Sequence, residues 1–426
     1  MANDIPKEKV TNILQYIARN WERTYPGDKP RHPHPQSEPC PYPYTTPTFD
    51  GELQYPFYWD TYFTNIGLHK QGRADLALSN IEALAYYLHR CGWVPNINYI
   101  GGMNRSQPPF LSMMVRDHFE ISGDREWLAR KEHALKFEYL FWMTERITPV
   151  GLNRFFHNAS ESEALTFFDD CLVPRVGASA GTKEQKLELA AHYFAEAESG
   201  ADFTSRFEGK CANHAATELN CNLYQYERNF AWMACLLGRP EEGTLWAGKA
   251  ARRAERIQRY FWNDQQGGFY DYNFIEGRNT TVFSPVAFCV LWRGLATFDQ
   301  AEKMRAKLAD IEHEWGVAAT DKVTFPRDLQ WDTPRGWPPH FYMTVEGLKR
   351  YGFDADARRI QEKYLKLNVK TFGESGCLWE KFDVVKGTKG VAEYGVYEQM
   401  GWTAGIFVAF AEDLGWTPPA DFRPSL

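Results

Sequence analysis

The strongest constraint on the fold is a regular alternation of helical segments with long loops along 426 residues. Apolar residues recur at three- and four-residue spacing, as Val10, Ile13, Leu14 and Ile17 do in the first segment. The predicted helices cover residues 7–25, 57–71, 75–90, 110–121, 125–147, 183–198, 213–237, 241–262, 285–296, 298–313, 340–351, 354–371 and 398–413. Short strand candidates, such as 268–272, lie in the loops between them.

About a dozen helices in antiparallel pairs, with alternating short and long connections, are typical of an (α/α)6 toroid. In that fold two concentric rings of helices place the long loops on one face. Helical periodicity alone does not distinguish a closed ring from an open superhelix. We therefore predict an all-α, single (α/α)6 domain over 1–426, with 1–50 as an N-terminal helix and a Pro-rich segment packed on it.

Composition excludes several classes of partner. The net charge of −7 argues against a nucleic-acid surface, where a basic stripe is expected. No apolar run approaches the length that spans a bilayer, and the first residues lack a secretory signal. The eight cysteines have no CxxC or metal-type spacing, which indicates free thiols in a reducing compartment. We expect a cytoplasmic protein without nucleic-acid or membrane partners; its oligomeric state is open.

Five loops combine Trp or Tyr with acidic, amide or Arg side chains, at 57–60, 95–107, 198–207, 330–340 and 378–402. Flat rings beside polar groups are typical of sugar sites, where rings contact C–H faces and polar ends bind hydroxyls. A single loop of this kind is most often only a well-packed turn. The prediction of a sugar site therefore rests on the recurrence of this composition in five loops. In a toroid these loops converge over the centre of one face.

Carboxylates in these loops indicate acid and base chemistry. Asp202 has an apolar neighbour on each side, and apolar walls raise the pKa of a carboxyl group so that it can protonate a leaving oxygen. Alternatively, Asp202 caps a helix or pairs with Arg206. Glycoside hydrolysis needs a second carboxyl group, and both Glu380 and Glu393 are candidates.

The loop at 330–339 is the most specific in composition. Trp331 and Trp337 provide flat apolar surfaces, and Gln330 and Asp332 offer acceptors for sugar hydroxyls. The histidines show no ligand spacing, and no G-x-S-x-G nucleophile motif is present. We therefore expect no metal and no cofactor, and a small-molecule glycoside as the substrate.

Two further segments are the most specific motifs, RSQPP at 105–109 and QWDTPRGW at 330–337. Others are YWDTYF at 58–63, ESGADFTSR at 198–206, WEKFD at 379–383, AEY at 392–394 and GWTAG at 401–405. Together, from about residue 58 to 405, they resemble the trehalase family and its relatives among (α/α)6 glycoside hydrolases.

The resemblance implies an inverting hydrolase of α-glycosides, with Asp202 as acid and Glu380 as base. Positions that match the family's sugar-binding subsite are Trp59, Asp60, Asn96, Arg105, Gln107, Trp331 and Asp332, and Glu393 and Trp402 match a closing segment. The same motifs add Tyr58, Gln330, Gly336 and Trp337 as candidate substrate-binding residues.

Departures from the family pattern concern the second sugar. Where trehalases carry PGGRFRE before YWD, Glu52 and Gln54 replace both arginines. Tyr99 replaces another arginine in PNGNR, and Ala201 replaces the Trp of ESGWD. The family's RPES motif has no clear counterpart. An arginine fork is not replaced by Glu or Tyr without changing recognition, so we predict an altered second subsite.

We predict an inverting α-glycosidase that acts on a small α-glucoside or α-mannoside of the glucosylglycerate or mannosylglycerate type. The glycerate carboxylate would be held by Tyr99, Gln107 or Arg206. The first alternative is an α,α-trehalase with an altered second subsite. Less favoured alternatives are an (α/α)6 sugar epimerase or isomerase, and a binding protein that has lost catalysis.

Overall fold

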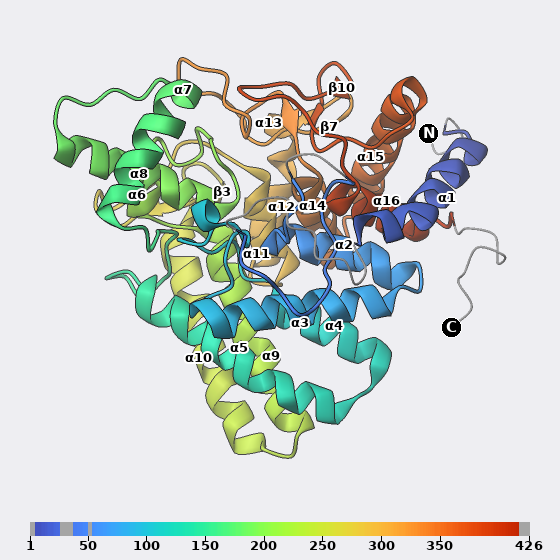
Figure 1. Ribbon diagram of the computed structural model, residues 1–426, viewed down its shortest axis with the longest axis horizontal. Helices are drawn as coiled ribbons and strands as arrows, with labels where there is room; N and C mark the ends of the chain where they lie inside the picture. Colours follow the sequence, from blue (N-terminus) through green and yellow to red (C-terminus); the bar gives the residue numbers. More distant parts are fainter. Residues whose placement is uncertain (1–4, 26–36, 50–52, 417–426) are drawn as a thin grey trace.

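The computed structural model describes residues 5–25, 37–49 and 53–416 and is mostly helical (Figure 1). Its α-helices are α1 (Lys7–Thr24), α2 (Tyr58–Lys70), α3 (Ala74–Cys91), α4 (Leu111–Ser122), α5 (Arg125–Glu145), α6 (Glu161–Phe167), α7 (Val173–Val176), α8 (Lys183–Ser199), α9 (Thr217–Leu236), α10 (Pro240–Phe261), α11 (Phe288–Trp292), α12 (Phe298–Ala306), α13 (Leu308–Ile311), α14 (Pro338–Arg350), α15 (Asp354–Ser375) and α16 (Gly401–Asp413). Short 3-10 or π turns are η2 (Ile100–Gly102), η3 (Phe168–Leu172), η4 (Cys211–Asn213) and η5 (Pro285–Ala287). Each predicted helix coincides with one of these helices or with a pair of them.

An inner ring is formed by α2, α4, α9, α11, α14 and α16, each packed against the next. The ring closes because α16, at the end of the chain, packs against α2. Two glycines allow this close approach: a Cβ at Gly405 would lie 2.0 Å from the carbonyl oxygen of Phe63, and one at Gly67 would lie 2.6 Å from the Cα of Gly405. The closed ring therefore replaces the open superhelix that periodicity left possible.

An outer ring is formed by α1, α3, α5, α10, α12 and α15, which side-chain contacts join in that order. These contacts are Glu22–Arg73, Glu82–Lys131, Lys136–Glu242, Gln258–Gln300, Arg305–Asp356 and the ring pair Tyr16–Phe372, which returns to α1. Two concentric rings of six helices confirm the predicted (α/α)6 toroid.

The two rings differ in burial, and this difference decides their sequence patterns. Every residue of α2 from Tyr58 to Leu68 is buried, and so is every residue of α16 from Gly401 to Ala411. By contrast, α1 buries one face only, including Val10. α2 and α16 are therefore covered on all sides over these residues, whereas α1 is amphipathic.

The main difference from the sequence prediction lies at residues 161–176, where no helix was expected. There α6 begins at a capping box in which Ser160 and Glu163 exchange side-chain and backbone hydrogen bonds. Together α6, η3, α7 and α8 lie at one side of the molecule (Figure 1) and share a second apolar cluster that includes Phe194 and Phe203. This cluster anchors the loop that carries Asp202.

Three helix boundaries also differ. The helix predicted at 213–237 begins at Thr217, because β1 precedes it and pairs with β4. The segment at 285–296 is a 3-10 turn followed by the short α11, and the segment at 298–313 divides into α12 and α13.

Of the Pro-rich segment, residues 26–36 lie outside the described residues. Residues 37–49 pack on the helices, as expected: the N–H of Thr45 donates to Asn80 (2.8 Å) and that of Thr46 to the carbonyl of Thr24 (2.9 Å). The single-domain assignment of 1–426 stays a prediction.

Among the described residues, ten short strands lie in the loops: β1 (His214–Ala215), β2 (Trp262–Asn263), β3 (Gly268–Phe269), β4 (Tyr272–Asn273), β5 (Arg278–Asn279), β6 (Glu312–His313), β7 (Gly316–Val317), β8 (Arg335–Gly336), β9 (Phe382–Asp383) and β10 (Thr388–Lys389). All pairings are antiparallel, in the orders β1-β4-β5, β10-β9-β8, β2-β3 and β6-β7. Pairing of Gly336 with Phe382 holds the loop at 330–337 beside the segment that carries Glu380.

Candidate active site

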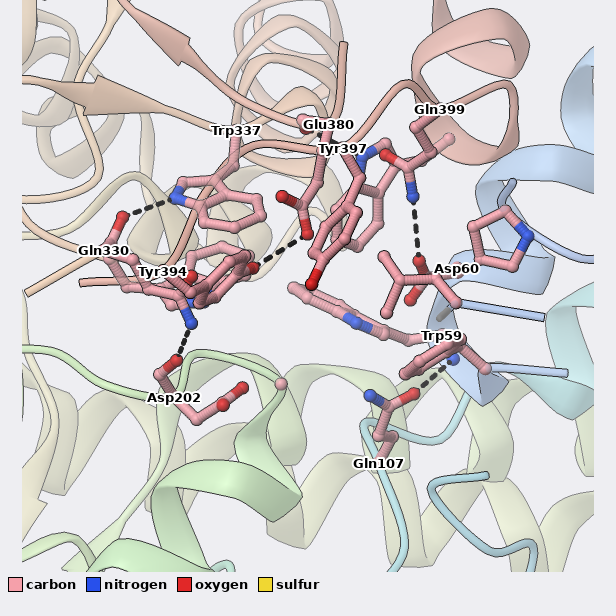
Figure 2. Close-up of a pocket in the computed structure, with 16 residues that line it drawn as sticks. Trp59, Asp60, Gln107, Asp202, Gln330, Trp337, Glu380, Tyr394, Tyr397 and Gln399 are labelled. Carbon is pink, nitrogen blue, oxygen red and sulfur yellow. Dashed lines mark hydrogen bonds between the residues drawn. The ribbon is translucent and has the colours of Figure 1, made fainter. Parts of the chain in front are cut away.

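A cavity opens at the N-terminal ends of the inner helices (Figure 2). Trp59 and Asp60 open α2, Gln107 precedes α4, Trp337 precedes α14, and Trp402 is the second residue of α16. The cavity is lined by Pro47, Leu53, Phe57, Trp59, Asp60, Gln107, Gly200, Asp202, Gln330, Trp331, Trp337, Glu380, Tyr394, Tyr397, Gln399 and Trp402. All five of the polar–aromatic loops selected from the sequence contribute to this lining.

Four buried tryptophans form one continuous aromatic surface of the cavity. Trp331 stacks on Trp337 with ring centroids 3.7 Å apart, and Trp59 lies 5.7 Å from Trp331. Trp402 stands nearly perpendicular to both Trp59 and Trp337. The indole N–H groups of Trp337 and Trp402 donate to backbone carbonyls, which fixes the orientation of these rings. These two rings therefore offer the cavity their carbon surfaces and no free N–H donor.

Asp202 follows the C-terminus of α8, with 34% of its side chain exposed. The expected apolar walls are present in part, because Phe203 is fully buried and Ala201 nearly so. However, the guanidinium of Arg175 lies 3.2 Å from Oδ2 of Asp202 and also donates to its backbone carbonyl. The carboxyl group therefore faces a cation, and not only apolar surface, in this structure.

The loop of Asp202 is tied to the loop at 330–332. Gln330 donates to the carbonyl of Asp202, and the N–H of Trp331 donates to the carbonyl of Phe203 (3.1 Å). The carboxylate of Asp332 accepts from the N–H (2.7 Å) and the hydroxyl (2.6 Å) of Ser205. Asp332 does not line the cavity; it positions the Asp202 loop instead of accepting sugar hydroxyls as predicted.

Glu380 reaches the cavity from the opposite side to Asp202 (Figure 2). Its Oε2 forms an ion pair with Lys381 (2.9 Å), and its Oε1 accepts from the hydroxyl of Tyr394 (2.8 Å). Burial raises the pKa of Glu380, while Lys381 and Tyr394 act in the opposite direction. Lys381 is fully buried, and burial lowers the pKa of its ammonium group.

Asp60 is the third carboxyl group of the cavity. Burial raises the pKa of Asp60 well above its ordinary value, and the negative charge of Glu380 adds to this rise. The side-chain amide of Gln399 donates to its carboxylate at 3.5 Å. Asp60 lines the cavity, and its role as a hydroxyl partner stays a prediction.

Glu393 does not line the cavity. Its Oε1 accepts from Arg175 at 3.2 Å, so Arg175 bridges Glu393 and Asp202. Burial raises the pKa of Glu393, and Arg175 opposes that rise. Of the two carboxylates considered for the base, only Glu380 lines the cavity.

Arg206 is not available to a substrate. It is buried between Glu218 and Asp271, and its guanidinium forms ion pairs with both carboxylates. Asp271 also accepts from the N–H of Thr217 (2.8 Å), at the start of α9. Arg206 therefore joins the end of the Asp202 loop to α9 and a strand hairpin, which argues against the predicted contact with glycerate.

Several other predicted substrate-binding residues also support the cavity from behind. The hydroxyl of Tyr58 donates to Glu138 and accepts from two backbone N–H groups before α4, and Asn96 donates to the carbonyl of Ala197. A Cβ at Gly336 would meet the carbonyl of Val317 at 2.7 Å, so this glycine serves strand packing. Tyr58, Asn96, Tyr99, Arg105 and Gly336 are all absent from the lining.

Sequence reasoning missed Phe57, Tyr397 and Gln399 in the lining, and Arg175 and Lys381 beside the carboxylates. Arg175 had a weak signal: it follows Pro174 upstream of the Asp202 loop, where the family motif RPES was sought. Lys381 follows Glu380 directly, and only the fold shows that its side chain turns back to its neighbour.

The part of the chain that the structure describes contains neither a candidate metal site nor a candidate membrane-spanning helix. These residues contain no group of three His, Cys, Asp or Glu side chains arranged to hold a metal ion. None of the described helices is long and apolar enough to cross a bilayer.

The fold and the site together define an (α/α)6 toroid with two carboxyl groups at a tryptophan-lined cavity. The trehalase family model matches residues 4–415, and the chain belongs to the trehalase family. Cytosolic neutral trehalase of Saccharomyces cerevisiae (strain ATCC 204508 / S288c) is 33% identical over 420 residues, covering 88% of this chain and 55% of that protein. The chain thus spans about half the length of this relative.

Two solved structures extend the comparison. Neutral trehalase Nth1 from Saccharomyces cerevisiae superposes with a TM-score of 0.75 at 30% identity, over 90% of this chain and 77% of the other. The GH63 mannosylglycerate hydrolase from Thermus thermophilus, in complex with Tris and D-glycerate, gives a TM-score of 0.64 at 18% identity, over 94% of this chain and all of that one. At that identity the second comparison supports the fold alone.

Proposed function

We propose that this enzyme is an inverting α-glycosidase acting on a small α-glucoside or α-mannoside of the glycosylglycerate type. Asp202 is the general acid and Glu380 the general base. The observation that carries the proposal is that these two carboxyl groups reach one tryptophan-lined cavity from opposite sides. We expect them to lie about 6.5–9.5 Å apart, which leaves room for the attacking water.

In the proposed reaction, Asp202 donates its proton to the glycosidic oxygen as the bond to the anomeric carbon breaks. Glu380 takes a proton from a water molecule, whose oxygen attacks the anomeric carbon from the other face. The ion pair with Lys381 favours the ionised form of Glu380, and Tyr394 fixes its orientation. The product is the β-anomer of the sugar and a free alcohol.

The leaving group is inferred from Arg175. Gln54 and Tyr99 stand at two positions where trehalases carry arginine. The side-chain amide of Gln54 donates to the carbonyl of Phe49, and the ring of Tyr99 packs near Tyr55. The third, Glu52, lies outside the described residues. Arg175 remains as a cation beside the acid. A guanidinium binds a carboxylate through two parallel hydrogen bonds, so an anionic leaving group suits this position.

Arg175 also links the substrate's charge to catalysis. In this structure the guanidinium of Arg175 lies 3.2 Å from Oδ2 of Asp202. The carboxylate of a bound glycerate moiety would replace Asp202 as the partner of Arg175. The carboxyl group of Asp202 would then be released from this ion pair and could face the leaving oxygen.

The test is kcat/KM for trehalose, glucosylglycerate and mannosylglycerate under identical conditions. We expect a glycosylglycerate to be preferred by at least about tenfold, because a site built for one polar partner rejects a mismatched one. The variant Arg175→Gln should remove most of this preference while affecting trehalose less. A tenfold preference for trehalose in the wild-type enzyme would contradict the proposed leaving group.

The second candidate is an α,α-trehalase with an altered second subsite, which is supported by the 33% identity to a neutral trehalase. The same assay separates the two candidates. Because that relative is described as cytosolic, we also propose a cytoplasmic location for this enzyme.

A further inference from the structure

A second cavity lies at the opposite end of the toroid from the active site. It is lined by residues at or near the C-terminal ends of the inner helices, including His69 and Lys70 of α2 and Glu346 of α14. At its N-terminal end, α2 carries Trp59. Trp337 is the residue just before the N-terminal end of α14. α2 lines both cavities, with Trp59 and Asp60 at the active site and Tyr62, Ile66, His69 and Lys70 at this one. We call this the far-end cavity.

Aromatic rings form one part of the far-end cavity. Trp292 lines it together with Tyr62, whose ring centroid is 6.3 Å away, and with Tyr342 at 5.6 Å. The side-chain amides of Gln225 and Asn229 lie in the same lining. Flat rings beside amides are the chemistry that binds the C–H faces and hydroxyls of sugars.

Most charges around the far-end cavity are already paired with each other. Arg116 pairs with Glu120 (3.0 Å), Lys349 with Glu346 (3.1 Å) and with Asp413 (2.7 Å), and Lys70 with Glu412 (3.3 Å). These pairs cancel charge around the rim, so the cavity does not offer a strong field to an ion of either sign.

Two polar groups of opposite charge remain incompletely satisfied. Arg293 is 9% exposed; its Nη2 donates to Asn222, but its buried Nε has no partner among the described residues. No described side chain or backbone group forms a hydrogen bond or ion pair with the carboxylate of Asp117, which is half-buried and whose pKa burial raises to about 7. An unpaired buried donor is unfavourable, so Nε of Arg293 favours a ligand that offers an acceptor.

A ligand hydroxyl satisfies both groups, whereas a simple ion satisfies only one of them. An anion would bind Arg293 but be repelled by Asp117, and an ammonium ion would do the reverse. A hydroxyl can accept from the guanidinium and donate to the carboxylate. We propose that the far-end cavity binds a neutral sugar or polyol, with its hydroxyls on Asp117 and Arg293 and its C–H face against Trp292.

The proposal is tested by soaking crystals of the full chain with glucose and with trehalose. We expect sugar density beside Trp292 in addition to any density at Trp59. Equilibrium titration with the same sugars then compares two variants: Asp117→Ala should lose one binding site or weaken it at least tenfold. Glu161→Ala, which removes an exposed carboxylate of α6 outside the cavity, should leave the number of sites unchanged.

Sugar density confined to the Trp59 cavity would overturn the proposal, as would unchanged binding in Asp117→Ala. Inorganic phosphate and glucose 6-phosphate serve as anionic probes. If phosphate occupies the far-end cavity and glucose does not, the ligand class is wrong. If Asp117→Ala fails to fold, the wild-type soak decides alone.

Discussion

The carboxyl group of Asp202 is one third exposed and pairs with Arg175, and its proposed role can be separated from that structural contact. We expect Asp202→Asn to lower kcat by about 10²–10⁴, because proton donation acts in the transition state, with little change in KM. The matched control is Asp169→Asn, whose carboxylate is 53% exposed and pairs with Lys186 on the same side of the molecule. If the Asp202 variant keeps activity within tenfold of wild type, the acid lies elsewhere, and Glu393 is the next candidate.

Lys381 is expected to set the pH dependence of the base. Burial raises the pKa of Glu380 and Lys381 lowers it, so Lys381→Met should raise that pKa further. A general base must be ionised, and the acidic limb of the kcat/KM profile should therefore move to higher pH, with activity recovering as the pH rises. Lys389→Met, which removes an exposed lysine of the neighbouring strand, should leave the profile unchanged. A profile that does not move in Lys381→Met would assign the acidic limb to another group.

At the scale of elements, Arg206 holds a loop, a helix and a hairpin together through Glu218 and Asp271. Arg206→Gln leaves two buried carboxylates without their cation, so we expect the free energy of unfolding to fall by about 3–5 kcal/mol. Arg358→Gln, at an exposed pair on α15, should cost no more than about 1 kcal/mol. Denaturant unfolding measures both. A stable Arg206→Gln enzyme with a raised KM would instead return Arg206 to the substrate-binding residues.

The motif loops could be found from the sequence, but the role of each residue within them could not. Gln330, Trp331 and Trp337 line the cavity, whereas Asp332 in the same motif binds Ser205. A motif shows that residues belong to one loop; which side chain faces the cavity depends on hydrogen bonds to segments distant in sequence. Arg175 was missed for the same reason, since its partner Asp202 is reached only through the packing of the second apolar cluster.

At the scale of the whole molecule, the helices were predictable because apolar residues recur at helical spacing, as in α1, and the helix ends carry turn residues. Ring closure was not predictable, because it depends on contacts between α2 and α16, more than 300 residues apart in the sequence of 426. Closure also assembles the site: Trp59 at the start of α2 contacts Trp402 at the start of α16, with ring centroids 5.8 Å apart.

The last prediction tests this closure. In Gly405→Ala the new Cβ would lie 2.0 Å from the carbonyl oxygen of Phe63, so α16 must move away from α2. We expect a loss of about 1–3 kcal/mol or more in the free energy of unfolding, together with a lower kcat/KM as Trp402 leaves Trp59. The control is Gly373→Ala on α15, where a Cβ meets nothing within 4 Å; it should be neutral or stabilise by up to about 1 kcal/mol. Equal stability of the two variants would show that α2 and α16 can separate without cost, and that the closed ring does not hold the active site together.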